Sequence, residues 1–116
     1  MKVYIYPNCS TCKQALKYLD SEGIAYDVID ISETAPSKSE LKKMYDAVGE
    51  DVRKLFNTSG KLYREGGYKD TIKAMSSKEV FDLLSSEGML VKRPFVISDS
   101  VQFVGFGEAQ KVKLKA

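Results

Sequence analysis

The chain has 116 residues, of which 43% are hydrophobic and 29% charged; these ordinary globular values exclude disorder, collagen and disulfide-dense scaffolds. Its 18 basic and 16 acidic residues leave a net charge of +2, so composition gives no electrostatic case for direct DNA or RNA binding. No apolar run approaches the about 18 residues of a membrane span, and Pro7 interrupts the short apolar N-terminus too early for a signal peptide. We therefore expect a single domain over residues 1–116, located in the cytoplasm.

The chain contains no histidine and only two cysteines, which removes several kinds of chemistry. Ser–His–Asp and Cys–His nucleophile systems both require a histidine. Two cysteines cannot fill the four positions of a structural zinc site, so we expect no metal and no other cofactor. In a cytoplasmic protein, two cysteines three residues apart are more consistent with redox activity than with a structural role.

The N-terminal part of the chain predicts a β-α-β unit. Residues 2–6 are β-branched and aromatic, which is typical of a buried strand. Apolar residues then recur at helical spacing from Ser10 to about Glu22, and Gly23 is placed to end this helix. Residues 26–31 alternate with a period of two, as in a second strand. This order predicts two parallel strands joined by a right-handed crossover.

The middle of the chain, about residues 36–90, predicts a helical insert. Its expected segments are a helix over about 37–49, a short helical turn over 52–56, a partly helical stretch over 61–74, and a helix from Ser76 to Gly88. Glu79 stands three residues after Ser76, which is the spacing of a capping box.

The C-terminal part returns to β-structure. Residues 95–97 and 101–104 are apolar and flank Ser98-Asp99-Ser100, which predicts a hairpin. A short charged helix from about Glu108 closes the chain.

The stretch Tyr6-Pro7-Asn8-Cys9-Ser10-Thr11-Cys12-Lys13 carries the most chemical information. Cys9 is expected at the N-terminal cap of the first helix, with Cys12 one turn inside. Unpaired N–H groups and the helix dipole stabilise an anion there, so we expect the pKa of the Cys9 thiol to be lowered. Lys13 adds positive charge, and no Asp or Glu occurs between residues 1 and 19. The sequence therefore predicts Cys9 as a nucleophile and Cys12 as the resolving cysteine of a Cys9–Cys12 disulfide.

A second candidate feature is Arg93-Pro94, directly before the predicted hairpin. Arg93 could donate hydrogen bonds to an oxyanion or thiolate, and a cis Pro94 could bring the backbone beside the cysteines. The alternatives are a surface arginine with an ordinary edge proline, and two cysteines that only pack in the core. The candidate catalytic residues are Cys9, Cys12 and Arg93, and the candidate substrate-binding residues are Asn8, Ser10, Thr11, Lys13 and Pro94.

Over nearly its whole length the sequence resembles the thioredoxin-fold arsenate reductase (ArsC) and Spx/MgsR family. The resemblance is carried by residues 6–13, by Tyr26 to Ile31, by the helical insert, by Lys92-Arg93-Pro94-Phe95-Val96-Ile97, and by Gly105-Phe106-Gly107-Glu108. It implies an α/β, thioredoxin-like fold with a four-stranded mixed sheet, βαβ then ββα, and the helical insert between these halves. It also implies that Pro94 is cis and that Arg93 reaches the Cys9 thiol.

The resemblance also bears on the substrate. In the arsenate reductases that the chain resembles, the cysteine matching Cys9 attacks arsenate, and three arginines bind the oxyanion. Arg93 matches one of these arginines, whereas Asn57 and Gly105 occupy the positions of the other two. Losing two of three oxyanion donors removes several kcal/mol of binding, so arsenate is not the expected substrate. Those reductases also lack a cysteine at the position of Cys12, which Spx-type regulators possess.

Three functional interpretations follow. The leading one is a cytosolic thiol–disulfide oxidoreductase of arsenate-reductase-like type, with thioredoxin or glutathione and glutaredoxin as the electron donor. The alternative is an Spx-like redox-sensing regulator that binds RNA polymerase through its α subunit. The third is a binding module whose cysteines do not cycle. We expect a monomer without direct contact to nucleic acid or membrane.

Overall fold

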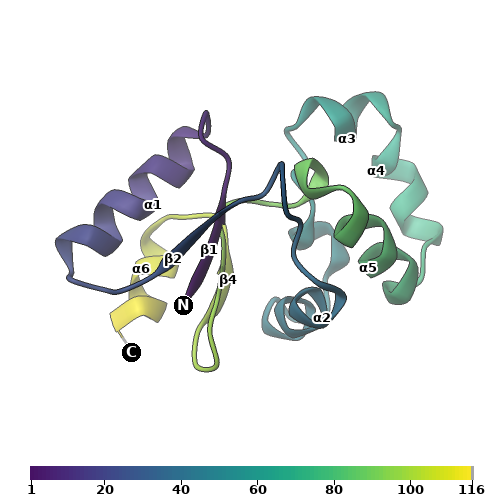
Figure 1. The fold of residues 1–116 in the computed structure, drawn as a ribbon. Helices are drawn as coiled ribbons and strands as arrows, with labels where there is room; N and C mark the ends of the chain where they lie inside the picture. Colours follow the sequence, from purple (N-terminus) through teal and green to yellow (C-terminus); the bar gives the residue numbers. More distant parts are fainter. Residues whose placement is uncertain (116) are drawn as a thin grey trace.

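The computed structural model describes residues 1–115 and contains a four-stranded mixed sheet (Figure 1). Its strands, in the spatial order β2-β1-β3-β4, are β1 (Lys2–Ile5), β2 (Asp27–Asp30), β3 (Phe95–Ile97) and β4 (Gln102–Val104). β1 pairs parallel with β2 and antiparallel with β3, and β3 pairs antiparallel with β4. The mixed sheet implied by the resemblance is therefore confirmed.

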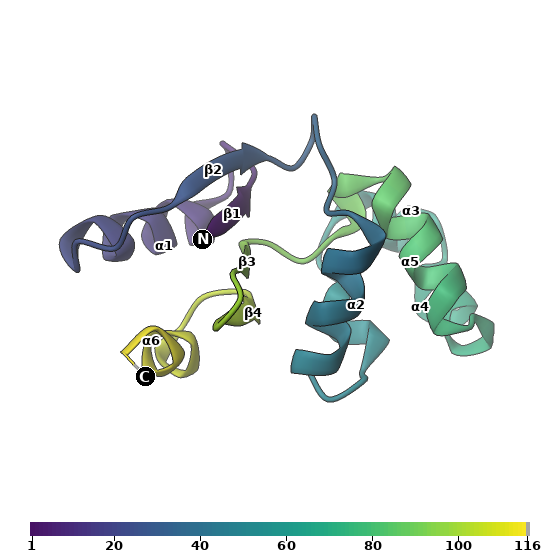
Figure 2. The same ribbon diagram turned by 60° about the horizontal axis from the view of Figure 1, so that its bottom comes forward.

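Helices lie on both faces of this sheet. The α-helices are α1 (Ser10–Ser21), α2 (Lys38–Ala47), α3 (Lys61–Glu65), α4 (Tyr68–Thr71), α5 (Ser77–Ser86) and α6 (Glu108–Lys115), and the 3-10 helices are η1 (Val52–Leu55), η2 (Ile72–Ala74) and η3 (Gly88–Leu90). In both ribbon views α1 and α6 lie on one side of the strands, and α2 to α5 lie on the other (Figures 1 and 2). Among residues 1–115, no helix is both long and apolar enough to cross a membrane.

The ends of the helices follow local sequence signals. Ser76 and Glu79 form the predicted capping box at the start of α5, and Ser37 and Glu40 form a second box, not predicted, at the start of α2. The stretch over residues 61–74 is helical only in part, as predicted, because Gly67 adopts a φ of 68° between α3 and α4.

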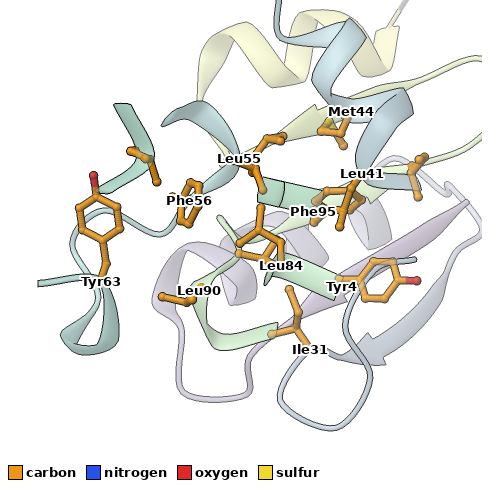
Figure 3. Close-up of a cluster of buried hydrophobic side chains, with 14 residues drawn as sticks. Tyr4, Ile31, Leu41, Met44, Leu55, Phe56, Tyr63, Leu84, Leu90 and Phe95 are labelled. Carbon is orange, nitrogen blue, oxygen red and sulfur yellow. The ribbon is translucent and has the colours of Figure 1, made fainter. Parts of the chain in front are cut away.

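Alternate residues of the strands face two separate hydrophobic clusters. Tyr4 and Phe95 face the helical insert, where their rings meet edge to face with centroids 5.6 Å apart. Val3 and Val96 face the opposite side, toward α1 and α6. The first cluster also includes Leu41, Met44, Leu55, Phe56, Leu84 and Leu90 (Figure 3). Because successive side chains of a strand point to opposite faces, the short strands of this sheet contact both helical layers.

A close backbone approach joins the insert to the end of β2. Gly88, the first residue of η3, is buried, and a Cβ placed on it would lie 1.9 Å from the carbonyl oxygen of Ile31. Ile31 is itself held by its N–H, which donates to the carbonyl of Ile5 at 2.8 Å. Only glycine fits at position 88 unless the backbone shifts.

Glu40 joins the same insert to β1 through polar contacts. Its carboxylate accepts hydrogen bonds from the Tyr4 hydroxyl at 2.7 Å, the Ser37 N–H at 3.0 Å and the Lys2 ammonium at 3.2 Å. Partial burial opposes ionisation of the carboxyl, but these hydrogen bonds and the charge of Lys2 outweigh it and hold the pKa of Glu40 below its ordinary value. Glu40 therefore stabilises the fold in its ionised form.

The Gly88→Ala substitution is expected to lower the free energy of unfolding by about 1–3 kcal/mol, because the added methyl group forces η3 away from Ile31. Gly107→Ala is the control, since a Cβ at Gly107 would meet its nearest neighbour at an ordinary 3.5 Å. Urea denaturation of the two variants measures the difference. Equal losses of stability in both would contradict the close approach.

The Glu40→Gln substitution is expected to cost about 1.5 kcal/mol near neutral pH, because it removes the charge from three hydrogen bonds. The pKa of Glu40 is lower in the folded than in the unfolded state. Its contribution is therefore present above the unfolded value of about 4.3 and is lost as pH falls through the folded value. Urea denaturation at pH 7 and at pH 3 should show the wild-type advantage shrinking in acid. Glu79→Gln, which alters a capping box on an exposed helix end, should cost less at pH 7.

Candidate active site

Cys9 lies at the N-terminal cap of α1, as the sequence predicted. Its backbone is extended, with φ −90° and ψ 115°, and the helix begins at Ser10. The Cys9 sulfur accepts a hydrogen bond from the backbone N–H of Cys12 at 3.4 Å. This N–H is one of those that the first turn of a helix leaves without an intrahelical acceptor. The same turn buries Cys12, which is 1% exposed, while Cys9 stays partly accessible.

The two thiols differ in their acidity. Partial burial of Cys9 opposes ionisation, but hydrogen bonds from the Cys12 thiol and N–H, the charge of Arg93 and the Thr11 N–H outweigh it and lower the pKa of Cys9. Burial, together with the hydrogen bond to Cys9 and the negative charge there, raises the pKa of Cys12 to about 12. The arrangement therefore favours a thiolate on the accessible sulfur and a neutral thiol on the buried one.

The charge of Arg93 acts on this site, although Arg93 lies more than eighty residues after Cys9 in the sequence. The Arg93–Pro94 peptide bond is cis, as the resemblance implied, and Pro94 is buried directly before β3. The Arg93 guanidinium lies 5.1 Å from the centroid of the Tyr6 ring and donates a hydrogen bond to the carbonyl of Met89 at 3.3 Å. Its positive charge favours the thiolate form of Cys9. Arg93 thus acts on the cysteine through charge, at a position held by an aromatic ring and a carbonyl.

Tyr6 and Met89 are site residues that sequence reasoning missed. Tyr6 was expected only as part of the buried strand over residues 2–6, and no role was expected for Met89. A signal for Tyr6 was present, because it continues the alternation of β1 on the same face as Tyr4. Met89 carried no such signal, since it takes part through its backbone carbonyl.

The other predicted site residues differ in their exposure and in their effect on the pKa of Cys9. Asn8, Ser10 and Lys13 are exposed beside the cysteines, and Lys13 is not among the groups that lower the pKa of Cys9. Thr11 is half-buried and contributes through its backbone N–H.

The positions matching the two other family arginines carry no charge. The backbone N–H of Asn57 donates to the carbonyl of Leu90 at 2.7 Å, and the Asn57 side chain accepts from the Ser59 hydroxyl at 3.5 Å. Gly105, with a φ of 74°, follows β4. Within the described part of the chain, Arg93 is the one cation whose charge lowers the pKa of both cysteines.

Comparison with known proteins identifies several relatives. Residues 4–113 match the family model described as "ArsC family". The uncharacterised protein YusI of Bacillus subtilis is 46% identical over 107 residues, covering 92% of this chain and 91% of YusI. An arsenate reductase of Neisseria meningitidis is 27% identical, covering 90% and 89% of the two chains, and the regulatory protein MgsR of Bacillus subtilis is 22% identical, covering 96% and 86%.

Solved structures share the fold. The crystal structure of an ArsC family related protein from Bacteroides fragilis superposes with a TM-score of 0.88 at 37% identity, covering 97% of each chain. That of a possible arsenate reductase from Streptococcus mutans superposes with a TM-score of 0.84 at 39% identity, covering 90% of this chain and 89% of that one. The thioredoxin-like fold implied by the resemblance is therefore confirmed.

Alkylation with iodoacetamide near pH 7 is expected to modify Cys9 well before Cys12, because the thiolate is the reactive form. Arg93→Gln should slow alkylation of Cys9 and move its pH profile to higher pH, since the cation that favours the thiolate is lost. Arg64→Gln, which removes the same charge from an exposed position on α3, should leave the profile unchanged. Peptide mass spectrometry at timed intervals measures both rates. Equal rates for the two cysteines, or an unchanged profile in Arg93→Gln, would contradict this description of the site.

Proposed function

Because this chain belongs to the ArsC family, a family of arsenate-reductase-like proteins with Spx and MgsR relatives, we propose that it is a thiol–disulfide oxidoreductase. In this proposal Cys9 is the nucleophile and Cys12 is the resolving cysteine. The supporting observation is the opposite change in the acidity of the two thiols, lowered at the accessible Cys9 and raised at the buried Cys12. In such a pair, one sulfur is ionised and reactive at neutral pH, while the other remains a neutral thiol until the first has reacted.

The first step is attack by the Cys9 thiolate on a substrate disulfide. A bond forms between Cys9 and one substrate sulfur, the substrate S–S bond breaks, and the other substrate sulfur leaves as a thiolate that takes up a proton. Arg93 lowers the energy of the anionic nucleophile before the attack. Asn8, Ser10 and Lys13 are exposed beside Cys9, and together with the half-buried Thr11 we assign them to contact with the incoming substrate. Pro94, also expected to bind substrate, is buried and is left out of this assignment.

The second step releases the product. Once Cys9 is in a mixed disulfide, it carries no negative charge. The hydrogen bond to the Cys9 thiolate and the repulsion by its charge, which both raise the pKa of Cys12, are then lost. The Cys12 thiol then loses its proton more easily and attacks the Cys9 sulfur, which forms the Cys9–Cys12 disulfide. The second substrate thiolate leaves and takes up a proton. In total, one substrate disulfide gains two electrons and the protein dithiol loses two, which thioredoxin or glutathione with glutaredoxin would restore.

A disulfide fits this site better than arsenate does. Arsenate is a multiply charged oxyanion that needs several donors in the transition state, and here Arg93 stands without the two arginines whose positions are held by Asn57 and Gly105. Attack on a disulfide develops negative charge on sulfur atoms only, so a single cation and a helix N-terminus can support it.

A second candidate is a redox-sensing regulator that binds the RNA polymerase α subunit. The relatives MgsR and Spx favour it, at 22% and 21% identity over 96% and 91% of this chain. In that case the same dithiol would change a binding surface and would not turn over substrate.

The test is a coupled assay with pre-oxidised protein, NADPH, thioredoxin reductase and thioredoxin, using hydroxyethyl disulfide as substrate. A parallel assay replaces the donor system with glutathione reductase, glutathione and glutaredoxin, and each donor system without the protein gives the background rate. We expect the wild type to sustain NADPH oxidation above the rate of the donor system alone, and Cys9→Ser to lose this excess completely. Cys12→Ser should stop at a mixed disulfide on Cys9, visible as added mass. Ser21→Ala is the control: it changes one small side chain at the other end of α1, away from the cysteines, and should retain activity.

Arsenate added to the same assay should give no further turnover. Arsenate-dependent NADPH oxidation that vanishes in Cys9→Ser would make the protein an arsenate reductase and would overturn the choice of substrate. A single stoichiometric reduction, combined with capture of the carboxy-terminal domain of RNA polymerase α in one redox state only, would favour the regulator.

A further inference from the structure

A cavity of about 780 Å³ opens along the free edge of β4, away from the cysteines. α6 borders it on one side, and the end of α2 with η1 borders it on the other; Figure 2 shows β4 between these two groups of helices. Its walls include apolar residues such as Val48 and Val104. None of the candidate catalytic residues lines it.

The cavity is strongly positive. Among residues 1–115, four cationic residues line it, namely Arg53, Lys54, Lys92 and Lys113, together with one acidic side chain, Asp51. The Asp51 side chain is engaged at the start of η1, where it accepts a hydrogen bond from the Arg53 N–H at 3.1 Å. Among the ion pairs found within residues 1–115, none involves any of these four cations. Their charge is therefore available to a ligand.

Backbone pairing brings three of these cations together from two distant parts of the sequence, and Lys113 joins them from α6. The Lys92 N–H donates to the carbonyl of Leu55 at 2.8 Å, and Phe56 forms an antiparallel bridge with Val91. These contacts hold η1, with Arg53 and Lys54, beside the residues that lead into β3. The cluster is thus built by the fold and is not a run of neighbours along one helix.

The side chains of Lys92 and Lys113 are also directed toward the cavity. A Cβ at Gly105 would lie 3.4 Å from Cε of Lys92, which places the lysine stem against the turn after β4. The Lys113 ammonium donates to the carbonyl of Gln102 at 3.4 Å, which holds it over the strand edge.

The same edge is closed to an added strand. The carbonyls of Gln102 and Val104 accept hydrogen bonds from the side chains of Lys113 and Gln110, both on α6. Side chains that occupy the acceptors of an edge strand prevent another strand from pairing there. An extended acidic peptide added to the sheet is therefore disfavoured, and a compact ligand is favoured.

We propose that this cavity binds a small molecule that carries a diphosphate or longer phosphate group. Its volume lies within the range of about 300–1,000 Å³ that is typical of small-molecule sites. An arginine with several lysines is the donor set that suits phosphate oxygens, and four cations match an anion of two or more charges. The apolar walls can receive the uncharged body of such a molecule. This proposal does not depend on any reaction of the cysteines.

The test is a titration of ¹⁵N-labelled reduced protein followed by amide chemical shifts, with inorganic pyrophosphate, ADP and adenosine as separate probes. Pyrophosphate and ADP should give saturable shifts at residues 52–58, 92 and 102–113, and adenosine should give none. Lys92→Gln should weaken binding about tenfold, and Arg53→Gln with Lys92→Gln more strongly, because each substitution removes one charge-assisted contact. The control pair, Lys61→Gln with Lys69→Gln, removes the same charge from exposed positions on α3 and α4 and should leave the affinity unchanged.

Several results would overturn the proposal. These are shifts that do not saturate with either phosphate probe, an equal loss of affinity in the control pair, or adenosine binding as well as ADP. Binding of a poly-glutamate peptide in place of pyrophosphate would assign the cavity to an acidic protein segment. Cys9→Ser should bind pyrophosphate as the wild type does, so failure of the redox function leaves this result intact.

Discussion

The start of α1 at Ser10 is the constraint on which the candidate site depends. A helix leaves its first N–H groups without backbone acceptors, and here one of them, from Cys12, donates to the Cys9 sulfur. The same turn places Cys12 in the hydrophobic cluster between the sheet and α1, where burial opposes its ionisation. One local backbone feature therefore makes two chemically identical side chains different, with the accessible sulfur the more acidic.

The candidate site also depends on a long-range interaction, because the cation that lowers the pKa of Cys9 lies more than eighty residues later in the chain. Arg93 stands at the entry to β3, which pairs with β1 directly before the cysteine loop. The helical insert lies between these strands in the sequence and packs on the sheet through Tyr4, Phe95 and the residues of Figure 3. Packing of the insert also positions Met89, whose carbonyl binds the Arg93 guanidinium. The insert thus contributes to the chemistry of the thiol without placing a side chain on it.

Lys92 and Arg93 are neighbours in the segment before β3, but their side chains lie on two different surfaces. The side chain of Arg93 lies on Tyr6 near the cysteines, whereas that of Lys92 lies against Gly105 and lines the cavity beside β4. The chain bends at Arg93, directly before the cis bond to Pro94, and the two neighbouring cations reach different surfaces there. A charged ligand in the cavity would therefore be one backbone unit away from the residue that favours the Cys9 thiolate.

The sequence by itself determined the order of elements, the position of Cys9 at a helix start, and the capping box of Ser76 and Glu79, since each depends on residues a few positions apart. The mixed sheet and the cis Pro94 followed from the family resemblance. Only the tertiary structure decided that Tyr6 and the Met89 carbonyl hold Arg93. It also decided that Lys13 is not among the groups that lower the pKa of Cys9. The cavity beside β4 likewise could not be predicted, because its cationic lining comes from distant segments, namely Arg53, Lys54, Lys92 and Lys113. These features depend on strand pairing and packing between segments distant in the chain, and hydrophobic periodicity encodes which face of an element is buried but not which distant residue it meets.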